Sequence, residues 1–144
     1  MKYWFTLLAL TSTLFISSMA QAACQHEGVC SQSYTLGPQF ISPKDGDTVS
    51  SPLLVKMGIK GMRVHKAGEI IEGTGHHHLI IDGAYIPENE VVPADDKHIH
   101  FGKGQTETTI KLKPGKHTLT LQFADGHHQS YGQVMSRTIH ITVK

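Results

Sequence analysis

Cysteine is scarce in this chain. Cys24 and Cys30 are the only two among 144 residues, and no CxxC pattern is present, which excludes a disulfide-dense scaffold and a cysteine-based zinc knuckle. In an oxidising compartment the pair is predicted to form a disulfide across a short loop, which removes little entropy from the unfolded chain and so adds little stability. A Cys/His metal clamp that uses His26 is the alternative. Lipidation of Cys24 is disfavoured because Gln21 stands where lipoproteins have an aliphatic residue.

An excess of charge of one sign is also absent. Lys and Arg number 13, Asp and Glu number 12, and no basic stretch interleaves aromatic residues, so no nucleic-acid partner is expected. The chain likewise has no Gly-x-Ser-x-Gly elbow, no Walker loop and no Gly-x-Gly-x-x-Gly, the motifs that carry nucleophilic and nucleotide chemistry. These absences argue against covalent catalysis.

Long apolar runs are confined to the N-terminus. Lys2 precedes an apolar stretch from Trp4 to Ile16, and Ala20-Gln21-Ala22 has small residues at the two positions that signal peptidase reads. Residues 1–22 are therefore predicted to be a cleavable signal peptide, and the protein is expected in the periplasm. Because the apolar stretch is shorter than the roughly 20 residues needed to cross a bilayer, no membrane span is expected.

The rest of the chain alternates apolar and polar residues with the two-residue period of half-buried strands. Gly, Pro and Asp residues separate the alternating stretches. About six to seven such strands predict an all-β fold, an immunoglobulin-like or related antiparallel β-sandwich over residues 39–144, preceded by an N-terminal segment, residues 23–38. The predicted strands are residues 39–42, 53–59, 77–82, 106–112, 118–123 and 138–143.

Two connections between these strands carry further expectations. Pro114-Gly115 lies between residues 106–112 and residues 118–123 and predicts a tight turn that joins them as a hairpin. Residues 83–97 hold two prolines among acidic residues and predict a long surface loop, a class of loop that is often functional.

Histidine is the abundant residue with its own chemistry, since the chain has 11. In Gly75-His76-His77-His78, alternation places His76 and His78 on one face of a strand, about 7 Å apart. His98-Ile99-His100 repeats this spacing. A His-x-His pair on a strand presents two imidazoles to one side, as a zinc or copper site requires.

A third histidine group, His127-His128, follows Asp125-Gly126 and is expected in a turn. Three segments that meet at one end of a sandwich supply the three or four ligands of a metal site. Gly75 and Gly102 are expected to permit the close approach of these segments. The sequence thus predicts a shared divalent ion, copper or zinc, whose ligands are His76, His78, His98 and His100, with His128 as an extra ligand.

Histidines also occur on half-buried strands without any metal, where backbone carbonyls or carboxylates satisfy their ring nitrogens. His65, His117 and His140 are assigned to this class. For the clustered histidines the corresponding alternative is hydrogen bonding to the acidic loop, with Asp95 and Asp96 as acceptors.

These residues leave three functions open, which rank as follows from the most to the least favoured. Binding or delivery of a metal comes first, and a metal-free envelope-interaction module comes second. A metal-dependent hydrolase or oxidase comes third, because structural and catalytic metal sites differ by a coordination position that sequence does not display. The candidate bases for that third function are Asp82, Asp95, Asp96 and Glu107. No protein partner is indicated by the residues.

Several strings along the chain together resemble the bacterial exported family called domain of unknown function 4399. The resemblance implies export and a compact β domain, and it places the histidine motifs at the family's most recognisable positions. It implies no catalytic residue. The strings are Phe40-Ile41-Ser42-Pro43-Lys44-Asp45-Gly46, residues 75–82, residues 93–96 running into His98-Ile99-His100-Phe101-Gly102, residues 104–107 and residues 114–119.

Overall fold

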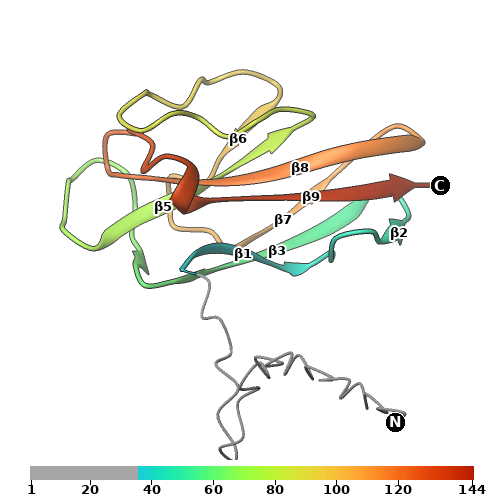
Figure 1. Ribbon diagram of the computed structural model, residues 1–144, viewed down its shortest axis with the longest axis horizontal. Helices are drawn as coiled ribbons and strands as arrows, with labels where there is room; N and C mark the ends of the chain where they lie inside the picture. Colours follow the sequence, from blue (N-terminus) through green and yellow to red (C-terminus); the bar gives the residue numbers. More distant parts are fainter. Residues whose placement is uncertain (1–35) are drawn as a thin grey trace, which may run out of the picture. The chain divides into compact units, whose positions relative to one another are not determined.

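Strands make up nearly all the regular structure of residues 36–144, as the two-residue period predicts (Figure 1). The computed structural model describes residues 36–144. The predicted signal peptide with its cleavage site, and the predicted Cys24–Cys30 disulfide, lie outside the described residues. The one helical element in residues 36–144 is a short 3-10 turn, η1 (Gln133–Met135). None of the helices in this part of the chain has the length and apolar character needed to cross a membrane.

Two sheets form a β-sandwich, so the predicted fold class is confirmed. The smaller sheet has the order β1-β3-β7, with strands Gly37–Ser42, Leu53–Lys60 and Glu107–Ile110. The larger sheet has the order β2-β9-β8-β5-β4, and β6 also pairs with β5. Its strands are β2 (Thr48–Val49), β4 (Arg63–Val64), β5 (Thr74–Ile81), β6 (His98–His100), β8 (Gly115–Ala124) and β9 (Ser136–Val143).

The hydrophobic core lies between the two sheets. Alternate residues of β3, β8 and β9 point into it, because successive side chains of a strand project to opposite faces. Burying these aliphatic and aromatic side chains stabilises the sandwich, at about 1.5–3 kcal/mol for each. The core residues are Phe40, Leu53, Val55, Met57, Leu79, Phe101, Ile110, Leu119, Leu121, Ile139, Ile141 and Val143.

The predicted hairpin around Pro114-Gly115 is wrong. β7 pairs with β3 in the smaller sheet, whereas β8 pairs with β5 and β9 in the larger one. The chain therefore changes sheets at this turn. Alternation cannot distinguish the two arrangements, because Ile110 and Leu119 are buried in the same core from opposite sides.

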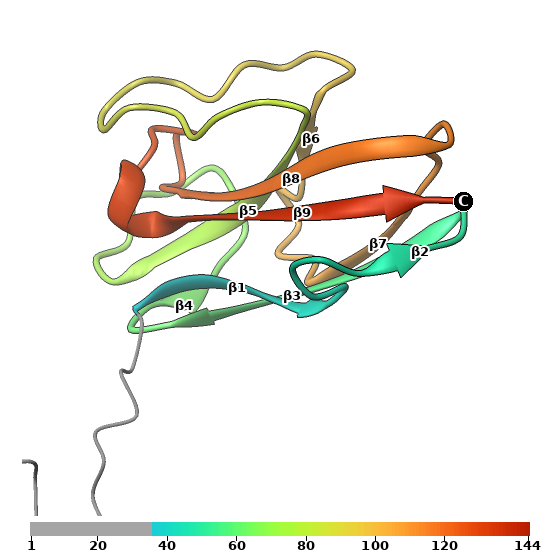
Figure 2. The same cartoon turned by 45° about the vertical axis from the view of Figure 1, so that its right-hand side comes forward.

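The β5 strand is buried on both of its faces. One face contributes to the core, and the other lies under the long loop that the sequence predicts over residues 83–97 (Figure 2). Gln122 on β8 ties this loop to the sheet, since its Oε1 accepts a hydrogen bond of 3.0 Å from the Ile86 backbone N–H. Strands buried on both faces are usually continuous apolar runs. Here three consecutive buried residues of β5 are His76, His77 and His78.

Candidate metal centre

Pairing of β5 with β6 brings two of the histidine motifs together. The two strands are antiparallel, with His78 opposite His100. Their rings stack, with centroids 5.1 Å apart and planes inclined by 23°. His76 lies two residues before His78 on the same face, and its ring centroid is 5.0 Å from that of His100. A local period and one strand register thus gather three imidazoles.

A tight turn after β8 adds His128. The buried carboxylate of Asp125 accepts hydrogen bonds from the backbone N–H groups of His127 at 2.8 Å and Gln129 at 2.9 Å. The His128 backbone adopts a positive φ of 68°, and its carbonyl accepts a hydrogen bond of 3.0 Å from the Val92 N–H in the covering loop. The turn and the loop together hold His128 against the β5–β6 pair.

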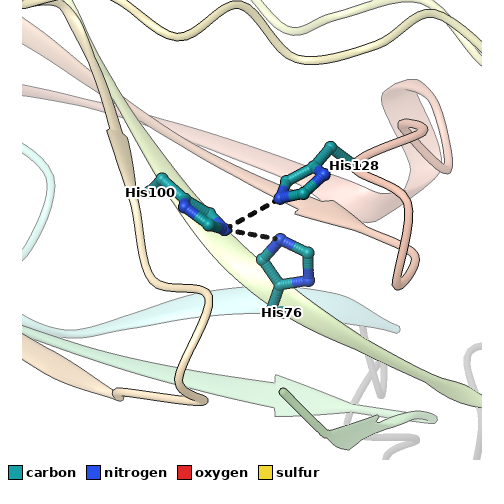
Figure 3. A group of neighbouring side chains, drawn as sticks. All are labelled: His76, His100 and His128. Atoms are coloured by element: carbon teal, nitrogen blue, oxygen red, sulfur yellow. Dashed lines mark hydrogen bonds between the residues drawn. The ribbon is translucent and has the colours of Figure 1, made fainter. Parts of the chain in front are cut away.

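Three Nε2 atoms converge at the centre of this group (Figure 3). The Nε2 of His100 lies 3.2 Å from that of His76 and 3.1 Å from that of His128. One ligand atom from each residue lies within 4.8 Å of the other two. The three ring planes are steeply inclined to one another, by 64° to 82°. Rings that radiate from one point in this way can direct their nitrogens at a single ion.

Hydrogen bonding alone accounts poorly for this geometry. A neutral imidazole nitrogen either donates one proton or offers one lone pair, yet the Nε2 of His100 lies close to two other ring nitrogens. This one nitrogen therefore cannot form well-aligned hydrogen bonds with both of its neighbours. Nitrogens bound at 2.0–2.1 Å to one tetrahedral zinc ion lie about 3.3 Å apart. The observed spacing of 3.1–3.2 Å is close to that value.

Burial keeps these histidines neutral. Desolvation, followed by repulsion from His100 and His128, lowers the pKa of His76 to about 4. Desolvation, followed by repulsion from His76, lowers the pKa of His78 to about 2. Burial, with repulsion from His128, also lowers the pKa of His100. Neutral imidazole is the form that binds a metal, so His76 and His100 are in the binding form at neutral pH.

Several buried ring nitrogens have no hydrogen-bond partner among the described residues. They are Nδ1 of His76, Nδ1 of His78 and both nitrogens of His77. His77 faces the core side of the sheet, where its ring lies 5.0 Å from that of Phe123. It therefore belongs to the packing of the strand and not to the cluster. Leaving such groups unpaired costs about 1–3 kcal/mol each, an expense that a packed strand of aliphatic residues avoids.

The structure brings four of the five predicted ligands together and places the fifth elsewhere. His76, His78, His100 and His128 have ring centroids within 5.9 Å of one another. The Nδ1 of His98 instead lies 2.7 Å from an oxygen of Asp95, a member of the covering loop. The predicted sharing of one ion by His98 and His100 therefore has no support in this geometry.

Histidines assigned to ordinary roles have the expected partners. His117 contacts Asp82 at 2.9 Å through Nδ1 and the Lys113 carbonyl at 2.9 Å through Nε2. The Nδ1 of His140 lies 3.3 Å from an oxygen of Asp45. The Nδ1 of His65 lies 3.0 Å from the Lys66 carbonyl.

Two glycines permit the close approach that the sequence predicts. A Cβ at Gly102 would overlap the His100 ring, and a Cβ at Gly75 would overlap the Ala124 carbonyl oxygen and the Phe123 ring. The role of Asp125 was not anticipated. The sequence feature that indicates this role is the Asp-Gly pair at the start of the turn, because an aspartate there often accepts a hydrogen bond from the backbone two residues on.

Fold and site together define an all-β sandwich protein with a three-histidine candidate metal centre on the outer face of its larger sheet. Residues 55–144 match the family model described as Domain of unknown function (DUF4399), and the chain belongs to this family. The match includes every histidine of the cluster. No curated protein and no solved structure matches the chain significantly.

Proposed function

We propose that this is a periplasmic protein that binds and delivers a divalent transition metal, copper or zinc, through Nε2 of His76, His100 and His128. The observation that carries the proposal is the convergence of three ring nitrogens, two pairs of them 3.1–3.2 Å apart. The low basicity of His76 and His100 supports it further, because protons compete weakly for such nitrogens at neutral pH.

The type of ligand limits which metal ions the site can bind. All three ligands are imidazoles, with no carboxylate or thiolate among the described residues of the group. Magnesium and calcium require oxygen ligands, whereas neutral imidazole suits zinc and copper. The nitrogens belong to three segments of the chain, so metal binding would also tie the turn that carries His128 to the sheet.

Binding is favoured over catalysis because three of the four acidic residues considered as bases are engaged with other groups. Asp82 bonds to His117 and to the Thr118 N–H, and Asp95 bonds to His98 and to the Lys97 N–H. Glu107 lies 3.9 Å from Lys56 in the smaller sheet. Residues 1–22, with the features of a signal peptide, support the periplasmic location.

Calorimetric titration of the tag-free exported protein with Zn(II) and with Cu(II) tests the proposal. We expect one ion per chain for the wild type, and loss of that binding in the His76→Ala/His100→Ala/His128→Ala variant. A control variant with alanine at His65, His98 and His140 removes the same number of histidines and should bind as the wild type does. Equal binding by all three proteins, or none by the wild type, would overturn the proposal. Intact-mass analysis of the exported protein, with Ala23 expected first, tests the location.

A further inference from the structure

The three-histidine cluster has a buried side and an exposed side. Resting on the function proposed above, we infer that a metal held by His76, His100 and His128 keeps a coordination position on the exposed side for a small anion from solvent. His78 closes the buried side as a packing partner of His100 and is not a fourth ligand.

Ring orientation separates His78 from the other three. The planes of His76, His100 and His128 are inclined to one another by 64° to 82°, as expected for ligands that radiate from one ion. The plane of His78 is inclined to that of His100 by only 23°. A ring that lies face to face with a ligand directs its nitrogens past the ion. His78 is also not a member of the group whose ligand atoms lie within 4.8 Å of one another.

Exposure sets the direction of the remaining position. His76 and His78 have 0% and 1% of their surface exposed, whereas His128 is partly exposed and His100 is exposed. The sheet and His78 thus occupy the inner side of the cluster. Three protein ligands around an ion that prefers four or more leave a position for an outside ligand, and His100 and His128 are the members of the cluster that are exposed to solvent.

Charge determines the class of that outside ligand. Three neutral imidazoles leave a divalent ion with its whole charge in a partly buried place, which is costly without a counter-charge. No carboxylate of the described residues belongs to the group of converging ligand atoms, and the Oδ1 of Asp125 already accepts two backbone hydrogen bonds. A small anion that binds the ion directly neutralises part of this charge, so an anion is favoured over a neutral donor.

Azide is a suitable probe because its bond to Cu(II) produces a charge-transfer absorption. The experiment adds sodium azide to protein loaded with one equivalent of Cu(II), with sodium perchlorate at equal ionic strength as the control. We expect a saturable azide band, no change with perchlorate, and loss of the pulsed-EPR signal of directly bound water as azide replaces it. The His78→Phe variant keeps the stacked ring and should retain both the bound Cu(II) and the azide band.

The outcomes separate this inference from the function on which it rests. Cu(II) that binds stoichiometrically but gives no azide band and no bound-water signal would overturn the inference and leave metal binding intact. So would a His78→Phe variant that responds to azide when the wild type does not, because His78 would then be the fourth ligand. Failure of the wild type to bind Cu(II) would overturn both. The water signal is read on the wild type, so the test holds even if His78→Phe does not fold.

Discussion

Two groups of histidines in residues 36–144 have opposite surroundings. His98, His117 and His140 each place Nδ1 against a carboxylate oxygen, at 2.7, 2.9 and 3.3 Å. In the cluster, the Nε2 of His100 lies at hydrogen-bonding distance from the ring nitrogens of His76 and His128. One group is satisfied by hydrogen bonds within the chain, and the other presents its nitrogens to one another.

The difference is expressed in proton affinity. The hydrogen bond to Asp82 raises the pKa of His117, whereas burial lowers the pKa of His76 to about 4. The same side chain is thus made a better base on the surface and a poorer one in the cluster. The pairing of a histidine with a carboxylate, more than its presence in a His-x-His motif, separates ordinary histidines from candidate ligands here.

The sharpest test of this difference lies within β6, where the two groups are two residues apart. His100→Ala should weaken metal binding at least about a thousandfold, because each ligand of a metal site accounts for several kcal/mol of its binding free energy. His98→Ala removes a histidine from the same strand and should leave the affinity nearly unchanged. Competition titration against a chelator of known affinity measures both. Equal losses in the two variants would show that the carboxylate pairing does not distinguish the groups.

Acid should destabilise the metal-free protein through the buried histidines. The pKa of His76 and of His77 is lowered to about 4 and that of His78 to about 2. Their unfolded values are about 6.5, so the unfolded chain binds more protons between these limits and unfolding becomes easier as the pH falls. The contribution of these neutral histidines to the free energy of unfolding is complete above a pH of about 6.5. Acidification removes about 3 kcal/mol of it for each histidine whose pKa is lowered to about 4.

Urea unfolding with a chelator present, followed from neutral pH to about 4, measures this loss. His117, one of the histidines that pair with a carboxylate, supplies a contribution of opposite sign. The pKa of His117 is raised, so its stabilisation is present below its unfolded pKa and is lost as the pH rises. Asp82→Asn should remove that contribution and make the acid loss steeper. A stability that stays level on acidification would contradict the burial of the cluster.

Asp125 differs from the carboxylates that pair with the surface histidines, because it accepts hydrogen bonds from backbone N–H groups and not from an imidazole. Asp125→Ala should free the turn that holds His128. We expect about a tenfold loss of metal affinity, the effect of removing a supporting partner, and about 1–2 kcal/mol lower stability. Asp45→Ala removes a carboxylate from the surface group and should leave metal affinity unchanged. Matching affinities in both variants would show that the turn does not position His128.

The smallest expected effect is a gain in stability at His77. Both of its ring nitrogens are buried without a partner among the described residues, and its ring lies edge to face with Phe123 at 5.0 Å. His77→Phe keeps the aromatic contact and removes the unpaired polar atoms, so it should raise the free energy of unfolding by about 1 kcal/mol. Metal affinity should not change, because His77 faces away from the cluster. Thermal unfolding checks the first claim, and a loss of stability would place an unseen partner on His77.

Local patterns in the sequence predicted the longer strands and the faces of their side chains, whereas the two-residue strands β2 and β4 were not predicted. Alternation put His76 and His78 on one face and His77 on the other, because the strand period is a property of the backbone alone. It also predicted the sandwich and the loop over residues 83–97. Gly102 was also recognisable from the sequence as a place of close approach, because glycine has no side chain.

Tertiary structure decided which histidines meet. His98 and His100 belong to one strand and one His-x-His motif, yet one bonds to Asp95 and the other lies beside His76. That choice depends on the register of β6 against β5 and on a turn held by Asp125, both set by contacts between distant residues. The sheet change at Pro114-Gly115 has the same cause. Periodicity reports which residues are buried, whereas the partner of each strand is set by packing across the whole chain.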